Sequence, residues 1–131
     1  MGRRRPKSPE QAFEYRVEAL LRKKGFLTLN CARSKPFDII AVKGNIGIPI
    51  ELKARSGHWS AEQEKFQKDL AKNSENGFMF IAQNRKRNKR GYMIDVVHFV
   101  CNIEDEWYTK IVREIMDAFT GCLNSVKVKY L

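Results

Sequence analysis

The sequence predicts a single α/β domain with a mixed central β-sheet of about five strands flanked by helices. The chain has 131 residues, which is about the length that one hydrophobic core organises. Its composition is 43% hydrophobic and 31% charged, as in ordinary globular proteins. Segments of helical and of β-rich character follow one another in the order one helix, three strands, one helix, two strands and one helix.

The helices are predicted from their caps and their periodicity. Ser8 and Gln11 form a capping-box pattern around Pro9, and apolar side chains then recur at helical spacing up to Gly25. A second capping box at Ser60 opens another helix. The predicted helices cover residues 9–24, 60–77 and 102–119. The predicted strands cover residues 26–31, 37–42, 48–55, 78–83 and 92–99.

The second and third strands are predicted to form a hairpin with Gly44 and Asn45 as its turn. In that register Asp38 lies directly opposite Glu51, so the two side chains share one face of the sheet at close range. Alternation along the strand places Lys53 on the same face, while the other face is apolar. The sequence therefore predicts a charged site on one side of the hairpin and the hydrophobic core on the other.

Two carboxylates held side by side destabilise the fold unless a cation lies between them. Mg²⁺ accepts such hard oxygen ligands together with waters and substrate phosphate. A neighbouring ammonium group such as Lys53 can activate a water or balance charge at the attacked phosphate. The pattern therefore suggests metal-assisted phosphodiester hydrolysis, although an isolated Glu-x-Lys is far more typical of an ordinary exposed hairpin face.

The first helix carries an acidic stripe. Glu10, Glu14 and Glu18 are spaced four residues apart, which is mildly unfavourable. Arg22 can pair with Glu18, whereas Glu14 has only glutamates at that spacing. Glu14 is therefore the glutamate that most needs an external cation, with a solvated helix face as the alternative.

Charge is the strongest compositional signal. The chain has 25 Lys and Arg against 15 Asp and Glu, a net charge of +10. The positive electrostatic field of such a charge favours a polyanionic partner, most commonly nucleic acid. The alternatives are that the charge serves only solubility or that it arose by chance in the composition. Three widely spaced cysteines and two histidines support neither a disulfide framework nor a zinc site, and we expect no small-molecule cofactor. The apolar runs are too short to cross a membrane.

We expect a cytoplasmic, intracellular protein, because no apolar stretch follows the basic N-terminus as it does in a secretory signal. Residues 1–7 contain four cations and are expected to form a flexible basic arm. Residues 8–131 are expected to form the single domain.

The order of the candidate residues resembles the PD-(D/E)XK nuclease superfamily, and most closely the archaeal-type Holliday junction resolvases. The pattern of that group is a helical glutamate, Gly-Phe after the helix, a serine-containing loop, an aspartate and Glu-x-Lys. The corresponding residues are Glu14, Gly25-Phe26, Ser34, Asp38 and Glu51-Leu52-Lys53. The likeness covers roughly residues 10–83. It departs from the superfamily pattern at Phe37, which immediately precedes the aspartate and leaves the proline one place earlier.

The resemblance implies a restriction-endonuclease-like fold and a metal-dependent endonuclease that nicks opposed strands of four-way DNA junctions as a homodimer. Asp38, Glu51 and Glu14 would then hold Mg²⁺, with Mn²⁺ as a substitute. Lys53 would orient or activate the water, and Ser34 would lie near the scissile phosphate. Gln63 matches a polar residue sometimes found at such sites, with helix capping as an equally good interpretation.

The resemblance also implies that exposed cations contact DNA phosphates. The candidates are Arg3, Arg4, Arg5, Lys7, Arg33, Lys35, Arg55, Arg85, Lys86, Arg87, Lys89 and Arg90. Residues 85–90 are expected to form a basic turn, for which a nuclear localisation patch or a solvated hairpin tip are alternatives. For the whole chain two other functions stay open. One is a restriction-like or nicking endonuclease of the same superfamily on other DNA, and the other is a non-catalytic basic nucleic-acid-binding module.

Overall fold

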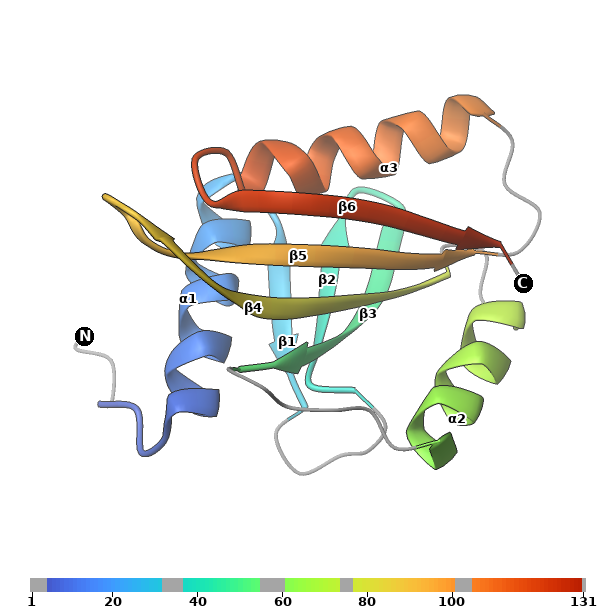
Figure 1. Cartoon of the computed structure of the whole chain (residues 1–131). Helices are drawn as coiled ribbons and strands as arrows, with labels where there is room; N and C mark the ends of the chain where they lie inside the picture. Colours follow the sequence, from blue (N-terminus) through green and yellow to red (C-terminus); the bar gives the residue numbers. More distant parts are fainter. Residues whose placement is uncertain (1–4, 32–36, 55–60, 74–76, 101–104, 131) are drawn as a thin grey trace.

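The structure is a computed structural model that describes residues 5–31, 37–54, 61–73, 77–100 and 105–130. Helices and one β-sheet make up these residues (Figure 1). The helices are α1 (Pro9–Lys23), α2 (Ala61–Lys72) and α3 (Asp105–Ala118). The strands are β1 (Leu27–Asn30), β2 (Ile39–Lys43), β3 (Ile46–Lys53), β4 (Phe78–Asn88), β5 (Gly91–Val100) and β6 (Leu123–Tyr130).

The strands form one mixed sheet in the order β1-β2-β3-β4-β5-β6. The pairs β1–β2, β2–β3 and β4–β5 are antiparallel, whereas β3–β4 and β5–β6 are parallel. The α/β class with a mixed, helix-flanked sheet is thus confirmed. The division into a flexible arm over residues 1–7 and a domain over residues 8–131 stays a prediction.

The strand β6 was missed by the sequence prediction, which ended with the last helix and gave about five strands instead of six. Its segment alternates in polarity, but Val126 and Val128 are only half-buried, and each is followed by an exposed lysine. β6 lies at the edge of the sheet beside β5, so it needs few apolar side chains. The weak pattern therefore reflects its edge position.

The expected basic turn over residues 85–90 is also corrected. The strand β4 runs on to Asn88, and only Lys89 and Arg90 form the turn before β5. A register shift between Gln83 and Arg87 interrupts the pairing with β5, which resumes where Arg87 pairs with Tyr92. Cations are compatible with a strand here because the side chains of residues 85–88, at the end of β4, are all exposed to solvent.

The hairpin register that the Gly44-Asn45 turn predicts is confirmed. Lys43 pairs with Ile46 across the turn, and Ile39 pairs with Ile50 near the other end. Gly44 has a φ of 62°, the left-handed conformation that glycine tolerates in such a turn. The apolar face of β3 is buried, as predicted, with Ile48 and Ile50 fully inaccessible.

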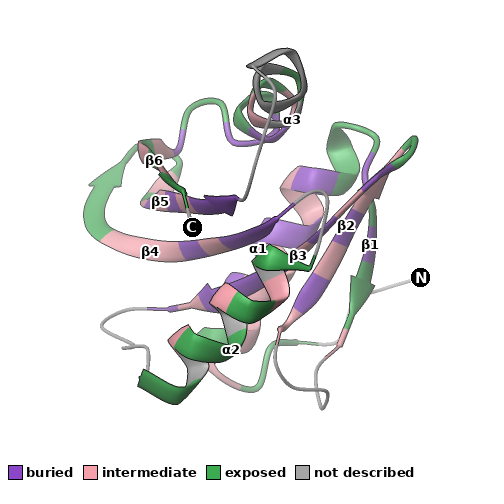
Figure 2. Cartoon of the chain, turned by 90° about the vertical axis from the view of Figure 1, so that its right-hand side faces the viewer, coloured by how far each residue is buried: buried purple, intermediate pink, exposed green. Residues whose placement is uncertain are grey.

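The main hydrophobic core lies on the face of the sheet that α1 and α3 cover (Figure 2). Helix α1 begins where predicted, since the Ser8 hydroxyl accepts a hydrogen bond from the N–H of Gln11 at 3.1 Å. Both helices contribute apolar side chains to the same cluster. These are Phe13, Val17 and Leu21 from α1 and Ile115 and Ala118 from α3, with Phe119 just after it.

The opposite face is less polar than the sequence suggested. Phe78 and Phe99 form a second buried cluster there, against which Leu70 of α2, Phe37, Phe80 and Val97 pack. Glu51 shares this face, since it pairs with Phe80 across β3 and β4. The candidate site therefore adjoins a small apolar layer.

None of the helices in the described residues is long and apolar enough to cross a membrane.

Gly77 is predicted to be a point at which the fold does not tolerate a side chain. Its φ is 68°, and a Cβ would collide with the carbonyl oxygen of Phe99. Gly77→Ala should lower the free energy of unfolding by about 3 kcal/mol, because backbone strain and a backbone clash add. Denaturant melts measure it.

Gly44→Ala is the matched control. Gly44 has a similar φ, but no atom lies within 4 Å of the position of a Cβ. Gly44→Ala should therefore lower the free energy of unfolding only by the backbone strain, about 1 kcal/mol. Equal losses for the two variants would show that the contact with Phe99 is unimportant.

Candidate active site

Asp38 is held in place by backbone groups on both sides of it. Its N–H donates to the carbonyl oxygen of Ile50 at 3.0 Å, and its carbonyl oxygen accepts from the N–H of Cys31 at 2.7 Å. Its carboxylate Oδ2 accepts the N–H of Leu52 at 2.8 Å. The side chain is therefore tied to β3 next to Glu51, which is the neighbour that the hairpin register predicted.

Glu51 is buried, with only 7% of its surface exposed. Burial raises the pKa of its carboxyl group to about 8, and a hydrogen bond to Asp38 and the charge of Asp38 act in the same direction. The charge of Lys53 and a backbone hydrogen bond at Leu52 oppose this shift. The Glu51 carboxyl group therefore holds its proton more tightly than an exposed glutamate does.

Glu14 reaches the same cluster from α1. Burial raises the pKa of its carboxyl group to about 7, and the negative charge of Asp38 adds to this shift. Glu18 and a hydrogen bond to Asp38 raise it further, whereas a hydrogen bond to Asn30 lowers it. Asp38 thus stands between Glu14 and Glu51 and is hydrogen-bonded to both.

The arrangement is suited to a hard divalent cation. The three side chains offer only carboxylate oxygens, and burial together with the neighbouring Asp38 carboxyl group raises the pKa of Glu14 and of Glu51. No three His, Cys, Asp or Glu side chains of the described residues are grouped closely enough to hold a metal ion. The fit is therefore to an ion such as Mg²⁺, which one or two carboxylates can hold while water and phosphate complete its shell.

Asp95 shows the contrast on the same face of the sheet. It pairs with Ala82, which pairs in turn with Lys53. Burial raises its pKa, but hydrogen bonds from Asn124, Asn84 and Ser125 outweigh that effect and hold the pKa below its usual value. Asp95 thus has a lowered pKa among amide and hydroxyl donors, whereas Glu14 and Glu51 have raised pKa values beside the carboxyl group of Asp38.

Asn30 is a site residue that sequence reasoning missed. It ends β1 and pairs with Ile39, the residue after Asp38. Its side chain is hydrogen-bonded to Glu14. The register of β1 against β2 would have revealed it. However, the two strands are joined by a long loop, whose length does not determine a register as a two-residue turn does.

Several predicted residues lie outside the described part of the chain. They are Arg3, Arg4, Arg33, Ser34, Lys35 and Arg55, and the side chain of Gln63. The other predicted DNA-contact cations are described, and all of them are exposed: Arg5, Lys7, Arg85, Lys86, Arg87, Lys89 and Arg90. Two of these also have partners within the protein. Arg87 lies over the ring of Tyr92 at 4.8 Å, and the Arg90 guanidinium donates to the carbonyl oxygen of Thr120 at 3.4 Å.

Comparison with solved structures identifies the fold. A Holliday junction resolvase, Hjc, from the hyperthermophilic archaeon Archaeoglobus fulgidus superposes on 66% of this chain and 71% of its own, with a TM-score of 0.50. The chain has the fold of this resolvase. The sequence identity is 22%, so the likeness establishes the resolvase fold and not the reaction. No protein-family profile and no curated protein matches the sequence.

The stability of the metal-free protein is predicted to fall as the pH rises. The ordinary pKa of a glutamate carboxyl group is 4.5, and the folded values are about 7 for Glu14 and about 8 for Glu51, so the folded state binds more protons than the unfolded state between these limits. The free energy of unfolding should decrease by about 2–4 kcal/mol from pH 5 to pH 8.5 in EDTA. Urea melts across this range measure it.

Glu51→Gln should flatten this pH dependence by roughly half, because it removes the group with the larger shift. Glu62→Gln is the matched control, since Glu62 is exposed on α2 and away from the cluster. A Glu51→Gln variant with the same slope as the wild type would show that Glu51 titrates normally.

Proposed function

We propose that the protein is a metal-dependent DNA endonuclease and, more narrowly, a Holliday junction resolvase that nicks opposed strands of four-way junctions. The observation that carries the proposal is the hydrogen-bonded series of carboxyl groups Glu14, Asp38 and Glu51 beside Lys53. The resolvase fold and the net charge of +10 support it.

In this proposal Asp38 and Glu51 hold Mg²⁺, or Mn²⁺ in its place, and Glu14 of α1 completes the site by its hydrogen bond to Asp38 rather than as a third ligand. A bound divalent ion supplies polarisation of the phosphodiester and a lowered pKa for water. The N–H of Leu52 keeps the Asp38 carboxylate oriented. The Lys53 ammonium group orients the attacking water or balances charge at the phosphate.

Exposed cations contact phosphates in this proposal, without reading sequence. The extension of β4 and its turn present Arg85, Lys86 and Lys89 to solvent, and Arg5 and Lys7 precede α1. Ser34 is assigned to the scissile phosphate from the resemblance. A homodimer would place one such site at each of two opposed strands, since two-fold symmetry duplicates the site.

Asp38→Asn should abolish cleavage of a four-way junction in Mg²⁺, with a fall of about 100-fold or more in the single-turnover rate. Junction binding should be retained, because the substitution removes a negative charge near the phosphates. Gel-based cleavage and binding assays measure the two quantities. Asp69→Asn, the same change on the exposed face of α2, is the matched control and should cleave normally.

The same assays separate the alternatives. Cleavage of linear duplex as fast as junction would indicate a restriction-like or nicking enzyme. Absence of cleavage by the wild type in both Mg²⁺ and Mn²⁺, with tight binding, would indicate a non-catalytic binding module. Undiminished cleavage by Asp38→Asn would contradict the proposed site.

Junction binding should weaken steeply with salt. If about six phosphates are neutralised, the slope of log K against log salt concentration is on the order of −5. Lys86→Ala and Lys89→Ala should each reduce the magnitude of the slope by about 1. Lys23→Ala, at the exposed end of α1, is the control. A nearly flat salt titration of the wild type would contradict phosphate binding by this surface.

A further inference from the structure

The face of the sheet that carries the candidate site continues as far as β6. Glu51 of β3 pairs with Phe80 of β4. Phe80 pairs with Val97 of β5, which pairs in turn with Lys127 of β6. Directly paired residues share one face of a sheet, so Lys127 lies on the same face as Glu51. Three strand spacings separate the two residues, which corresponds to about 14 Å.

A second lysine of β6 has the same orientation. Lys129 pairs with Phe99, which belongs to the small apolar cluster on the face of the site. Its ammonium group lies 5.7 Å from the centre of the Phe99 ring. Val126, which precedes Lys127, packs against the main core on the other face. The strand β6 therefore directs its valine to the core and its two lysines to the face of the site.

A bulge in β6 sets this orientation. Ile94 pairs with Leu123, but the next pair is Asp95 with Ser125, so Asn124 is an extra residue. The Asn124 amide and the Ser125 hydroxyl each donate to Oδ1 of Asp95 at 2.7 Å. A slip of one residue would turn every following side chain to the other face. The hydrogen bonds to Asp95 therefore fix the two lysines on the face of the site.

The two lysines are available for an anionic partner. Both are exposed, and neither forms an ion pair with another described residue. The charge of Lys127 interacts with Asp95, but both oxygens of that carboxylate already accept hydrogen bonds from amide and hydroxyl groups. Lysines on an edge strand can also serve only to prevent edge-to-edge aggregation. Their position on the face of the site favours a role in binding instead.

The surface between the site and β6 is accessible beside α2. Helix α3 lies on the opposite side of β4, β5 and β6 (Figure 2). Helix α2 packs through Leu70 against the cluster of Phe78 and Phe99, at one end of these strands. The row of paired residues on the other side of Lys127 is only half-buried. Its members are Lys53, Ala82, Asp95 and Ser125.

We propose that β6 is a phosphate-binding strand, in which Lys127 and Lys129 hold the backbone of a DNA arm whose scissile phosphate lies beside Glu51. This inference rests on the proposed nuclease function. Each strand of duplex DNA carries one phosphate per about 3.4 Å of its axis, so 14 Å corresponds to about four nucleotides. Contacts of this kind fix the position of the DNA on the protein and read no sequence.

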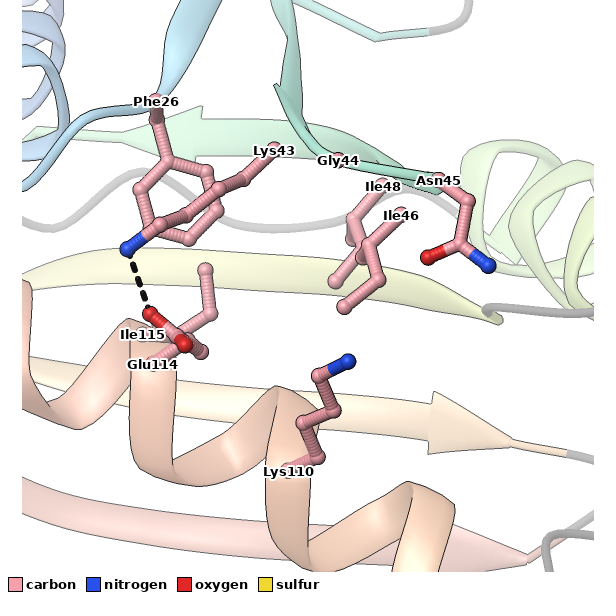
Figure 3. Close-up of a pocket in the computed structure, with 9 residues that line it drawn as sticks. All are labelled: Phe26, Lys43, Gly44, Asn45, Ile46, Ile48, Lys110, Glu114 and Ile115. Atoms are coloured by element: carbon pink, nitrogen blue, oxygen red, sulfur yellow. Dashed lines mark hydrogen bonds and ion pairs between the residues drawn. The ribbon is translucent and has the colours of Figure 1, made fainter.

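Binding of a four-way junction by the full chain in EDTA, followed by fluorescence anisotropy, tests the proposal. The double variant Lys127→Gln, Lys129→Gln should reduce the magnitude of the slope of log K against log salt concentration by about 1.8, because each phosphate contact contributes about 0.9. Lys110→Gln is the matched control and should leave the slope unchanged. Lys110 is exposed on α3 and extends toward the β2–β3 turn on the core side of the sheet (Figure 3).

Hydroxyl-radical footprinting of the same complexes tests the position of the contacts. Lys53→Gln should remove protection from the DNA backbone near the site, since Lys53 is two residues from Glu51. The double variant should remove protection about four nucleotides away. Both positions are measured without cleavage by the protein. Loss of protection at the same nucleotides in both variants would overturn the proposed path of the DNA.

The outcomes separate this proposal from the nuclease activity. An unchanged slope in the double variant, with normal junction cleavage by the wild type, would overturn only the role of β6. A double variant that aggregates more readily but keeps the slope would show that the lysines protect the edge, and would also overturn it. A reduced slope in a protein that cuts no DNA would support β6 as a DNA-binding strand and refute the nuclease activity. Absence of DNA binding by the wild type would overturn both.

Discussion

The constraint on which the site depends is the enforced contact between the carboxyl groups of Asp38 and Glu51. A two-residue turn sets the register of β2 against β3, and backbone hydrogen bonds hold Asp38 against β3. Because Glu51 is buried, water cannot separate the two charges. The pair therefore needs either a proton or a cation, and this requirement is what makes the site a candidate for metal chemistry.

Asp95, on the same sheet, shows that an acidic side chain does not by itself require a cation. Asp95 receives three side-chain hydrogen bonds and has a lowered pKa, whereas Glu14 and Glu51 have raised pKa values. Burial is the largest cause of the raised pKa values of Glu14 and Glu51, and the carboxyl group of Asp38 adds to it. At Asp95, hydrogen bonds from amides and a hydroxyl outweigh burial. The close approach of the carboxyl groups of Asp38 and Glu51 is unfavourable. The hydrophobic core on the opposite face of β3 stabilises the fold and so offsets this cost.

The basic extension of β4 and β5 is anchored to other parts of the fold. The Arg16 guanidinium of α1 donates to the carbonyl oxygen of Tyr92 at 2.7 Å, and the Asn88 amide donates to the carbonyl oxygen of Gly121. These contacts tie the extension to α1 and to the segment before β6. A cationic segment that the sequence predicts as a turn is thus, over most of its length, a positioned strand pair.

Local sequence patterns predict the hairpin, the contact of Asp38 with Glu51 and the three helices. Turn chemistry, alternation and capping involve neighbouring residues, so they can be recognised before the fold is known. Three features became evident only in the folded protein: the sixth strand, the contact of Asn30 with Glu14, and the apolar cluster of Phe78 and Phe99 beside the site. These features depend on edge pairing, on register across a long loop and on the packing of α2, which bring together residues that no local pattern connects.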